Sequence, residues 1–337
     1  MAAFLGPRHG CERSGSVCWH RGDRINVITD DDIDFDAYLQ GPDECANVKP
    51  ASSWLDDVLE AFRTPPEVTG ASFPWTKTRP IARLRRGELS IWPGMSGHGK
   101  SILSSQVMLS LMAQGERVCI ASMEMKPVET MQRMCRQALG CNTPRVGDIK
   151  DFHRWTDGKL WLYDQQGSVT PDRILAVARY THSKLAATHM VIDNLMTCGI
   201  PEDGDGWQSR QKQFILDLSC HSHDTRQAVH LLAHVRKQQD ESRPPSKFDV
   251  RGSASITDLA DNVYTVWRNK PKEADRESGA NTKSDEADCL LIVDKCRHGA
   301  WEGRIQLWFD RDSQSYVERC EEQPTAMRFD DEMEVDF

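Results

Sequence analysis

The stretch GMSGHGKS, residues 94–101, constrains the fold of this chain more than any other segment. Its spacing, G-x-x-x-x-G-K-S, follows a β-prone run at 88–92 and precedes an apolar, helix-forming run at 101–113. A glycine-rich turn between a strand and a helix points backbone N–H groups inward, and the helix N-terminus adds partial positive charge. The pattern predicts a phosphate-binding loop containing Gly94, Gly97 and Gly99, with Lys100 on the outer phosphates and Ser101 on magnesium.

Strand-type and helix-type patterns alternate along the chain and indicate the fold class. We expect strands at 88–92, 117–122, 189–193, 228–233, 262–267, 288–294 and 304–309, and helices at 101–113, 127–138, 171–186, 207–221 and 252–261. Such alternation predicts an α/β fold in which helices flank a central, mostly parallel sheet. The last strands follow one another with only loops between them, so the far edge of the sheet is expected to be antiparallel.

Composition divides the chain into four regions. Residues 1–50 are polar and acidic and are expected to form a flexible extension or a small module. Residues 51–80 contain an amphipathic helix at 53–62 and then a proline-containing linker. The α/β domain is expected at 81–320, followed by an acidic tail at 321–337. Within the domain, the segment 271–287 is charged and lacks apolar anchors, so we expect a mobile surface loop there.

The overall charge is −9, from 42 Lys+Arg and 51 Asp+Glu. Acid is concentrated in DDDIDFD near the start and in the last seventeen residues, EEQPTAMRFDDEMEVDF, so a positive central channel is compatible with the acidic sum. The chain contains no apolar run long enough to span a membrane, and MAAFLGPRHG is too short in apolar residues for a secretory signal. We therefore expect a cytoplasmic protein that does not contact membranes.

The chain has 11 cysteines and no C-x-x-C pair, so reduced thiols are expected rather than a disulfide framework. One cluster differs, because His9, Cys11, Cys18 and His20 lie close together in HGCERSGSVCWH. Their spacing fits no standard zinc finger. A zinc site and a flexible tail both remain open at this point.

Two carboxylates and a histidine end three of the expected strands. Asp193 ends the strand in THMVIDNL, and a carboxylate in that position lies beside the phosphate-binding loop, where it would contact magnesium. Glu124 follows RVCIASM and would activate the attacking water; pairing with the start of the helix that Pro127 opens is the alternative. His234 ends AVHLLAH and would sense the outermost phosphate, with His230 as a competitor and a buried core role open for either.

The series of segments resembles one protein family. GMSGHGKS, ASMEM, HMVIDNL, LLAHVRK, FDVRGSASITDLADNVYTVWRNK and DKCRHG followed by GRIQLWFD occur in the order and approximate spacing of the conserved motifs of hexameric, DnaB-like replicative DNA helicases, with most similarity to phage ring helicases and to the mitochondrial helicase Twinkle. The resemblance spans residues 75–318. It implies a RecA-like P-loop NTPase domain, ATP or another NTP with Mg²⁺ as cofactors, and a homo-oligomeric, hexameric ring on single-stranded DNA at a replication fork.

The same resemblance implies roles for individual residues. Glu124 matches the catalytic base, Asp193 the second magnesium contact, and His234 the γ-phosphate sensor that also responds to DNA. Arg297 matches an arginine finger that reaches the ATP of the neighbouring subunit, with Lys295 beside it. A surface arginine in a turn is the alternative.

The resemblance further implies that Arg268 and Phe309 hold the adenine base between them. DNA would be bound by the loop between His234 and Gly252, whose basic residues can follow a phosphate backbone without reading its sequence. These residues are Arg236, Lys237, Arg243, Lys247 and Arg251, together with Gly252 at the end of the loop. The acidic loop at 199–206 is the second candidate, through its backbone amides.

The two ends of the chain differ from those of the family members, which changes the functions expected of them. The first 75 residues or so cannot hold a primase or a large helical domain in familiar form, so no primase activity is expected. The helix at 53–62 occupies the place of a linker helix that docks on the adjacent subunit, with packing on its own subunit as the alternative. The tail ending in Phe337 resembles tails that bind DNA polymerases, with an inert solubilising tail as the alternative.

Two other classes of function share these features. A RecA-like recombinase that assembles as open filaments on DNA has the same core. A nucleotide-gated scaffold without DNA-stimulated turnover is the third possibility, which the set of Glu124, Asp193 and Arg297 disfavours.

Overall fold

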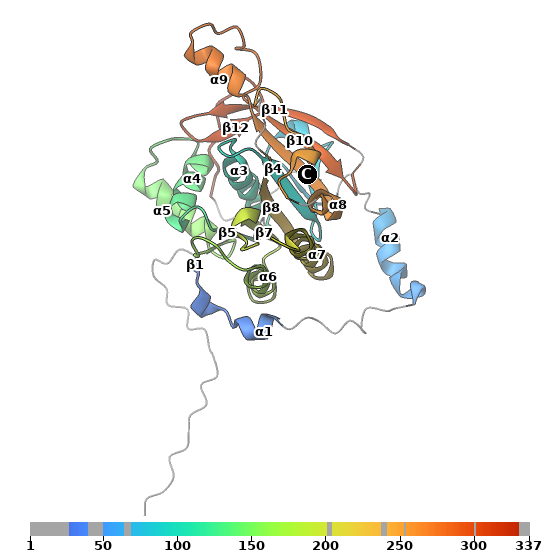
Figure 1. Ribbon diagram of the computed structural model, residues 1–337. Coiled ribbons are helices and arrows are strands. Elements are labelled where there is room, and N and C mark those ends of the chain that lie inside the picture. Colours follow the sequence, from blue (N-terminus) through green and yellow to red (C-terminus); the bar gives the residue numbers. More distant parts are fainter. Residues whose placement is uncertain are drawn as a thin grey trace, which may run out of the picture.

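The computed structural model describes residues 27–39, 50–63, 69–200, 204–236, 241–252, 254–299 and 301–329. Its centre is a ten-stranded sheet with the order β1-β6-β5-β7-β8-β4-β9-β10-β11-β12 (Figure 1). In that order the strands are β1 (Val27–Ile28), β6 (Leu160–Tyr163), β5 (Val118–Ser122), β7 (His189–Asp193), β8 (Ala228–His234), β4 (Leu89–Gly94), β9 (Asn262–Arg268), β10 (Cys289–Cys296), β11 (Gly303–Asp310) and β12 (Ser315–Val317). The pairings from β1 to β9 are parallel, and those from β9 to β12 are antiparallel. This confirms the expected mostly parallel sheet with an antiparallel far edge.

Helices cover both faces of the sheet (Figure 1). The covering helices are α3 (Lys100–Ala113), α4 (Pro127–Leu139), α5 (Val146–Thr156), α6 (Pro171–Leu185), α7 (Trp207–Thr225) and α8 (Ser255–Leu259). The other helices are α1 (Phe35–Leu39), which lies on α6, and α2 (Leu55–Arg63) and α9 (Lys270–Glu277), which lie away from the faces of the sheet (Figure 1). Because side chains alternate along a strand, each strand contributes to two apolar cores. On β4, Trp92 packs in the core with α3, α4 and α5, while Ile91 packs in the core with α6, α7 and α8.

The start of the described chain belongs to the domain, which corrects its assignment to a flexible extension. Strand β1 pairs with β6, and α1 lies on α6, where the rings of Tyr38 and Tyr180 are 5.7 Å apart. Asp30, from the acidic run, accepts a hydrogen bond from the Tyr163 hydroxyl at 2.6 Å and forms an ion pair with Arg173. These contacts with residues far away in the sequence hold residues 27–39 against the domain, although their polar, acidic composition favours exposure to solvent.

The boundaries at residues 81 and 320 also need correction. Before residue 81, Phe73 and Trp75 are buried, β2 (Ala71–Ser72) pairs with β3 (Arg83–Leu84), and the Trp75 indole donates to the Tyr316 carbonyl at 2.9 Å. After residue 320, the Met327 N–H donates to the Ala138 carbonyl at 2.7 Å, and the Phe329 ring lies 5.5 Å from that of Trp155. The domain thus includes residues 69–84 and the chain up to 329.

Local structure differs from expectation in two further places. The segment 271–287, expected to be a loop, begins with α9, because the Asn269 side chain accepts from the Lys272 N–H at 3.0 Å and Pro271 fits the first turn. Lys272 also pairs with Asp288 at 2.9 Å. Helix α5 and strand β6 were not expected at all; β6 has only four residues, LWLY, and is recognisable as a strand only beside β1 and β5.

The cysteines in the described part of the chain are unpaired, and several are buried, as expected. Among the described residues, no helix has the length and apolar character needed to cross a membrane, and no group of three or more His, Cys, Asp or Glu side chains is arranged to hold a metal ion. The four candidate zinc ligands between His9 and His20 lie outside the described residues, as do residues 330–337 of the acidic tail.

Candidate nucleotide site and nucleic-acid interface

The phosphate-binding loop joins the end of β4 to the start of α3, as the sequence predicted. Gly97 and Gly99 have φ angles of 76° and 82°, in the left-handed region that favours glycine. Close packing adds a second constraint. A Cβ at Gly99 would lie 2.3 Å from the Tyr316 hydroxyl, and one at Gly94 would lie 2.6 Å from the Val266 carbonyl oxygen.

Lys100 is buried at the base of this loop. Its Nζ donates to the carbonyl oxygens of Gly94 at 2.9 Å and Met95 at 3.0 Å, and it lies 3.4 Å from Nδ1 of His234. Burial lowers the pKa of Lys100 to about 8, although the nearby carboxylates of Asp193 and Glu124 oppose the shift. The negative charge of an incoming phosphate would stabilise the charged form of this buried ammonium group.

Ser101 and Asp193 form the magnesium side of the site. The Ser101 hydroxyl donates to the Asp193 carboxylate at 2.6 Å, and Asp193 is buried at the end of β7. Burial raises the pKa of Asp193, and the Ser101 hydrogen bond opposes that shift. A hydroxyl and a carboxylate oxygen suit a magnesium ion that also binds phosphate oxygens.

Glu124, Asn194 and His234 are linked by hydrogen bonds at the same edge of the sheet. The Asn194 amide nitrogen lies 2.6 Å from Glu124 Oε1 and 3.0 Å from His234 Nε2. Asn194 therefore connects the expected base to the expected sensor. Our sequence reasoning missed it, although its position directly after Asp193 was an available signal.

His234 and His230 lie in different surroundings. His234 is at the end of β8, which pairs with β7 as expected, and burial lowers its pKa, with Lys100 adding to the effect. His230 is fully buried between the Trp92 indole, 3.3 Å from Nδ1, and His189, 3.0 Å from Nε2. His230 therefore belongs to the core and is not a candidate sensor.

Arg133 is a second residue that sequence reasoning missed. It lies on α4, where one Nη contacts the Met125 sulfur at 3.0 Å, and its Nε has no hydrogen-bond partner in the described part of the chain. Burial lowers its pKa, and the charge of Asp193 opposes that shift. A half-buried guanidinium that responds to the charge of Asp193 can attract phosphate oxygens.

Arg268 and Phe309 lie beside the phosphate-binding loop. Both line a cavity of about 90 Å³, together with Gly99, Ile102 and Tyr316. Arg268 donates to the Gly97 carbonyl at 3.3 Å and pairs with Glu273 at 2.5 Å, so its guanidinium is positioned next to the loop. The Phe309 ring lies 5.1 Å from that of Tyr316.

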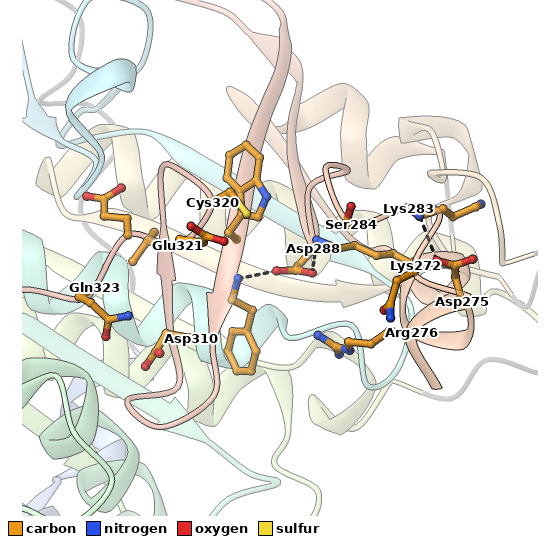
Figure 2. A pocket seen from close by; sticks show the side chains of 15 residues that line it. Lys272, Asp275, Arg276, Lys283, Ser284, Asp288, Asp310, Cys320, Glu321 and Gln323 are labelled. Carbon is orange, nitrogen blue, oxygen red and sulfur yellow. Dashed lines mark hydrogen bonds and ion pairs between the residues drawn. The ribbon is translucent and has the colours of Figure 1, made fainter. Parts of the chain in front are cut away.

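A larger pocket of about 360 Å³ adjoins this cavity and shares Arg276, Asp288 and Phe309 with it. Figure 2 shows Asp288 at its centre, in contact with Lys272 on one side and with the Phe309 backbone, at 2.9 Å, on the other. Asp288 thus sets the position of the backbone that carries the Phe309 ring.

Arg297 and Lys295 lie at the opposite edge of the sheet from the phosphate-binding loop. Strand β10 is antiparallel to β9, so its last residue, Cys296, pairs with the first residue of β9, Asn262. The length of β9 separates this edge from the loop by about 20 Å. Arg297 donates to Asp261 at 2.9 Å, and Lys295 donates to the carbonyls of Thr257 and Asp258 at 3.0 and 2.9 Å.

The basic loop is fastened directly to the strand that ends in His234. Val235 and Val250 form an antiparallel bridge, the Arg236 N–H donates to the Asp249 carbonyl, and the Arg251 N–H donates to the His234 carbonyl, both at 2.8 Å. Of the expected DNA-binding residues, Arg236, Arg243 and Arg251 are exposed and Lys247 is half-buried. Lys237 lies outside the described residues.

Gly252, also expected to bind DNA, packs against α7. A Cβ there would lie 2.4 Å from the Gln211 side chain, and its φ angle of 120° excludes most other residues. Packing against Gln211 and the positive φ angle together explain the need for glycine at this position.

The sheet order, the phosphate-binding loop and the acid at the end of β7 together define a P-loop NTPase domain of the RecA-like class. Residues 79–318 match the model of the DnaB-like helicase C terminal domain, and the chain belongs to that family. A DNA helicase/primase of Enterobacteria phage T3 is 24% identical over 204 residues, which cover 55% of this chain and 36% of the phage protein. The chain thus spans about a third of that curated relative.

Solved structures agree on the fold. One solved ATPase domain superposes with a TM-score of 0.68 at 17% identity, covering 81% of this chain and 99% of that domain. A DnaB-like replicative helicase, whose structure was described with its interactions with primase, superposes with a TM-score of 0.67 at 17% identity, covering 81% of this chain and 69% of that one.

Proposed function

We propose that this chain is the motor of a DNA helicase that assembles as a ring of six subunits. It uses ATP hydrolysis to move along single-stranded DNA and to separate duplex at a replication fork. The observation that supports this most is the continuous set of contacts from Lys100 through His234 to the base of the basic loop. Two contacts, Lys100 to His234 and His234 to Arg251, would connect the bound nucleotide to the loop that would hold DNA.

In this proposal the chain's own residues divide the work of hydrolysis. Lys100 binds the outer phosphates, and Ser101 and Asp193 hold magnesium, which neutralises developing charge on the phosphates when bound. Glu124 orients the attacking water and accepts its proton. The products are ADP, or the corresponding diphosphate, and inorganic phosphate.

His234 would report the state of the nucleotide to DNA. It lies 3.4 Å from Lys100 on one side and contacts Asn194 on the other, and its carbonyl accepts from the Arg251 N–H. Loss of the outermost phosphate would change what Lys100 and His234 contact. The loop bonded to the same strand end would then shift along the DNA backbone.

Arg297 would complete the site of a neighbouring subunit. Its distance from its own phosphate-binding loop, about 20 Å along β9, favours action in trans, and its guanidinium is partly exposed beside Asp261. A guanidinium supplied by a neighbour stabilises charge in the transition state and ties hydrolysis to assembly. Arg268 and Phe309 would bind the base in the adjacent cavity.

The deciding experiment measures ATP hydrolysis with and without single-stranded DNA, together with unwinding of a forked duplex. We expect DNA to stimulate hydrolysis and the fork to be unwound, and Glu124→Gln to bind nucleotide while failing at both. An equal rate of ATP hydrolysis with and without DNA would argue against the proposal. Open filaments in electron micrographs, in place of closed rings, would favour a recombinase.

A further inference from the structure

Phe248 is an aromatic residue at the surface of the basic loop. It lies in a 3-10 turn, Lys247–Asp249, and its side chain is 80% exposed. Exposure of a large aromatic ring to water is unfavourable, and the phosphate chemistry described above makes no use of it.

The turn holds Phe248 outward on a fixed base. Asp249 accepts hydrogen bonds from the Ser246 N–H at 2.8 Å and from the Ser246 hydroxyl at 3.0 Å. The next residue, Val250, is buried and bridges to Val235 at the end of β8. The ring is therefore presented by a bonded turn, so little conformational entropy is lost when a flat partner stacks on it.

Lys247 lies beside the Phe248 ring, and Arg251 and Met196 lie close to each other near the end of the same loop. Lys247 Nζ lies 5.7 Å from the Phe248 ring centroid. Arg251 lies within 4.0 Å of the Met196 sulfur, and Met196, in the turn after β7, is itself 44% exposed. The carboxylate of Asp249 accepts hydrogen bonds from Ser246, and that of Asp294 accepts one from Thr265 at 2.5 Å. Lys247 Nζ donates to the backbone carbonyl of Asp294 at 3.3 Å, so this cation lies beside both the ring and strand β10.

We propose that Phe248 stacks on a base of the bound single-stranded DNA, while Lys247 and Arg251 contact the flanking phosphates. A nucleic-acid strand offers flat π faces and negative phosphates together, and an exposed ring beside Lys247, with Arg251 further along the same loop, matches both. An apolar protein partner would match the ring but not the cations. This inference rests on the proposed function and adds a base contact to a loop otherwise expected to hold only the backbone.

The test compares affinities for a fluorescent oligothymidylate in the presence of a non-hydrolysable ATP analogue, measured by anisotropy. Stacking on one base predicts that Phe248→Ala raises Kd between about fivefold and a hundredfold. Phe248→Trp should bind at least as tightly as the unchanged protein, and Phe248→Leu should resemble the alanine variant. The matched control is Val146→Ala, which shortens another exposed apolar side chain, 69% exposed and on α5.

Two further measurements make the test specific for bases. Tryptophan fluorescence of Phe248→Trp should be quenched by DNA at the concentrations that saturate anisotropy, and an abasic oligonucleotide should reduce the difference between the unchanged protein and Phe248→Ala. The stacking contact would be overturned if the unchanged protein and Phe248→Ala bound oligothymidylate with the same Kd, or if Phe248→Leu bound it as tightly as the unchanged protein. Either result would leave the helicase proposal intact. Failure of the unchanged protein to bind DNA would overturn both.

Discussion

Lys100 is expected to link nucleotide binding to pH. In the free site its pKa is lowered to about 8 by burial, whereas bound phosphates favour the charged ammonium. Binding above that pH must therefore take up a proton.

We expect the affinity for ATP to be constant below about pH 8 and to fall by up to about tenfold per unit above it. Calorimetric titrations across this range, in buffers of different ionisation enthalpy, would measure both the affinity and the proton uptake. The Lys100→Arg variant stays charged throughout and should show no such slope. A flat profile for the unchanged protein would show that Lys100 is protonated before the nucleotide arrives.

Asn194 is expected to couple the base to the sensor. Replacement by alanine removes the bonds to Glu124 and His234, at 2.6 and 3.0 Å, and leaves Lys100 and Ser101 in place. We predict that Asn194→Ala retains nucleotide binding and loses at least about tenfold in DNA-stimulated hydrolysis, since positioning of the water and the sensor both depend on these bonds. Steady-state hydrolysis with and without DNA, alongside a nucleotide-binding titration, measures this. Unchanged stimulation by DNA would exclude Asn194 from the coupling.

Helix α2 exposes an apolar face that its own domain does not cover. Leu55 is 60% and Phe62 85% exposed, and Figure 1 shows the helix standing apart from the sheet and its flanking helices. The expected role of a linker helix that docks on an adjacent subunit accounts for this face. The alternative, packing on its own subunit, is not what the structure shows.

The double variant Leu55→Ser, Phe62→Ser should therefore weaken assembly without unfolding the domain. We expect light scattering to show smaller species in the presence of nucleotide, while the thermal unfolding midpoint of the dilute protein is unchanged. Asp57→Ala, on the polar face of the same helix, is the control. Assembly by the double variant at the same concentration as the unchanged protein would rule out docking through α2.

The central strands contain a stacked pair of buried histidines. His230 on β8 and His189 on β7 stack with ring centroids 5.3 Å apart, and burial lowers the pKa of His230 well below its ordinary value. The unfolded chain therefore binds a proton at His230 more readily than the folded chain. Stability from this residue is present above about pH 6.5 and is lost as the pH falls below that value.

Urea unfolding between about pH 7.5 and pH 5.5 checks this expectation. The free energy of unfolding should fall by up to about 1.4 kcal/mol per pH unit from His230 alone. His234 also has a lowered pKa and acts in the same direction. His230→Gln should reduce the slope, and an identical slope in that variant would assign the acid sensitivity to other groups.

For the assembled protein, the proposed active site is shared between subunits, and mixing experiments can reveal this. Lys100→Ala and Arg297→Ala are each expected to abolish hydrolysis, with nucleotide binding retained in the second. In equimolar mixed rings, about a quarter of the interfaces would unite an intact Lys100 with an intact Arg297. Hydrolysis by the mixture, above that of either variant alone, is the expected result. If cross-linking shows that the rings contain both variants and the mixture still does not hydrolyse ATP, Arg297 lies outside the shared site. Full activity of Arg297→Ala alone would lead to the same conclusion.

Local sequence patterns were sufficient to select the residues of the candidate nucleotide site. Gly94 to Ser101 join a strand to a helix, Asp193 and His234 end strands, and Glu124 follows the end of β5 by two residues. The carboxyl ends of adjacent parallel strands meet at one edge of a sheet. The sequence pattern alone therefore predicts that these residues lie close together, since the prediction requires no side-chain contact. The order of motifs along the chain then indicated the family.

Other features depended on contacts between residues far apart in the chain. Asp30 was assigned to a flexible extension or small module and Phe73 to a linker, because their partners Arg173, Tyr163 and Tyr264 are distant in sequence. The link from Glu124 through Asn194 to His234, and the choice of His234 over His230, follow from the pairing of β7 with β8. Sequence determined which chemical groups stand at the ends of the strands, since that is a local property. Only the tertiary structure decided which of them touch, because contact depends on strand order and on burial that no local pattern encodes.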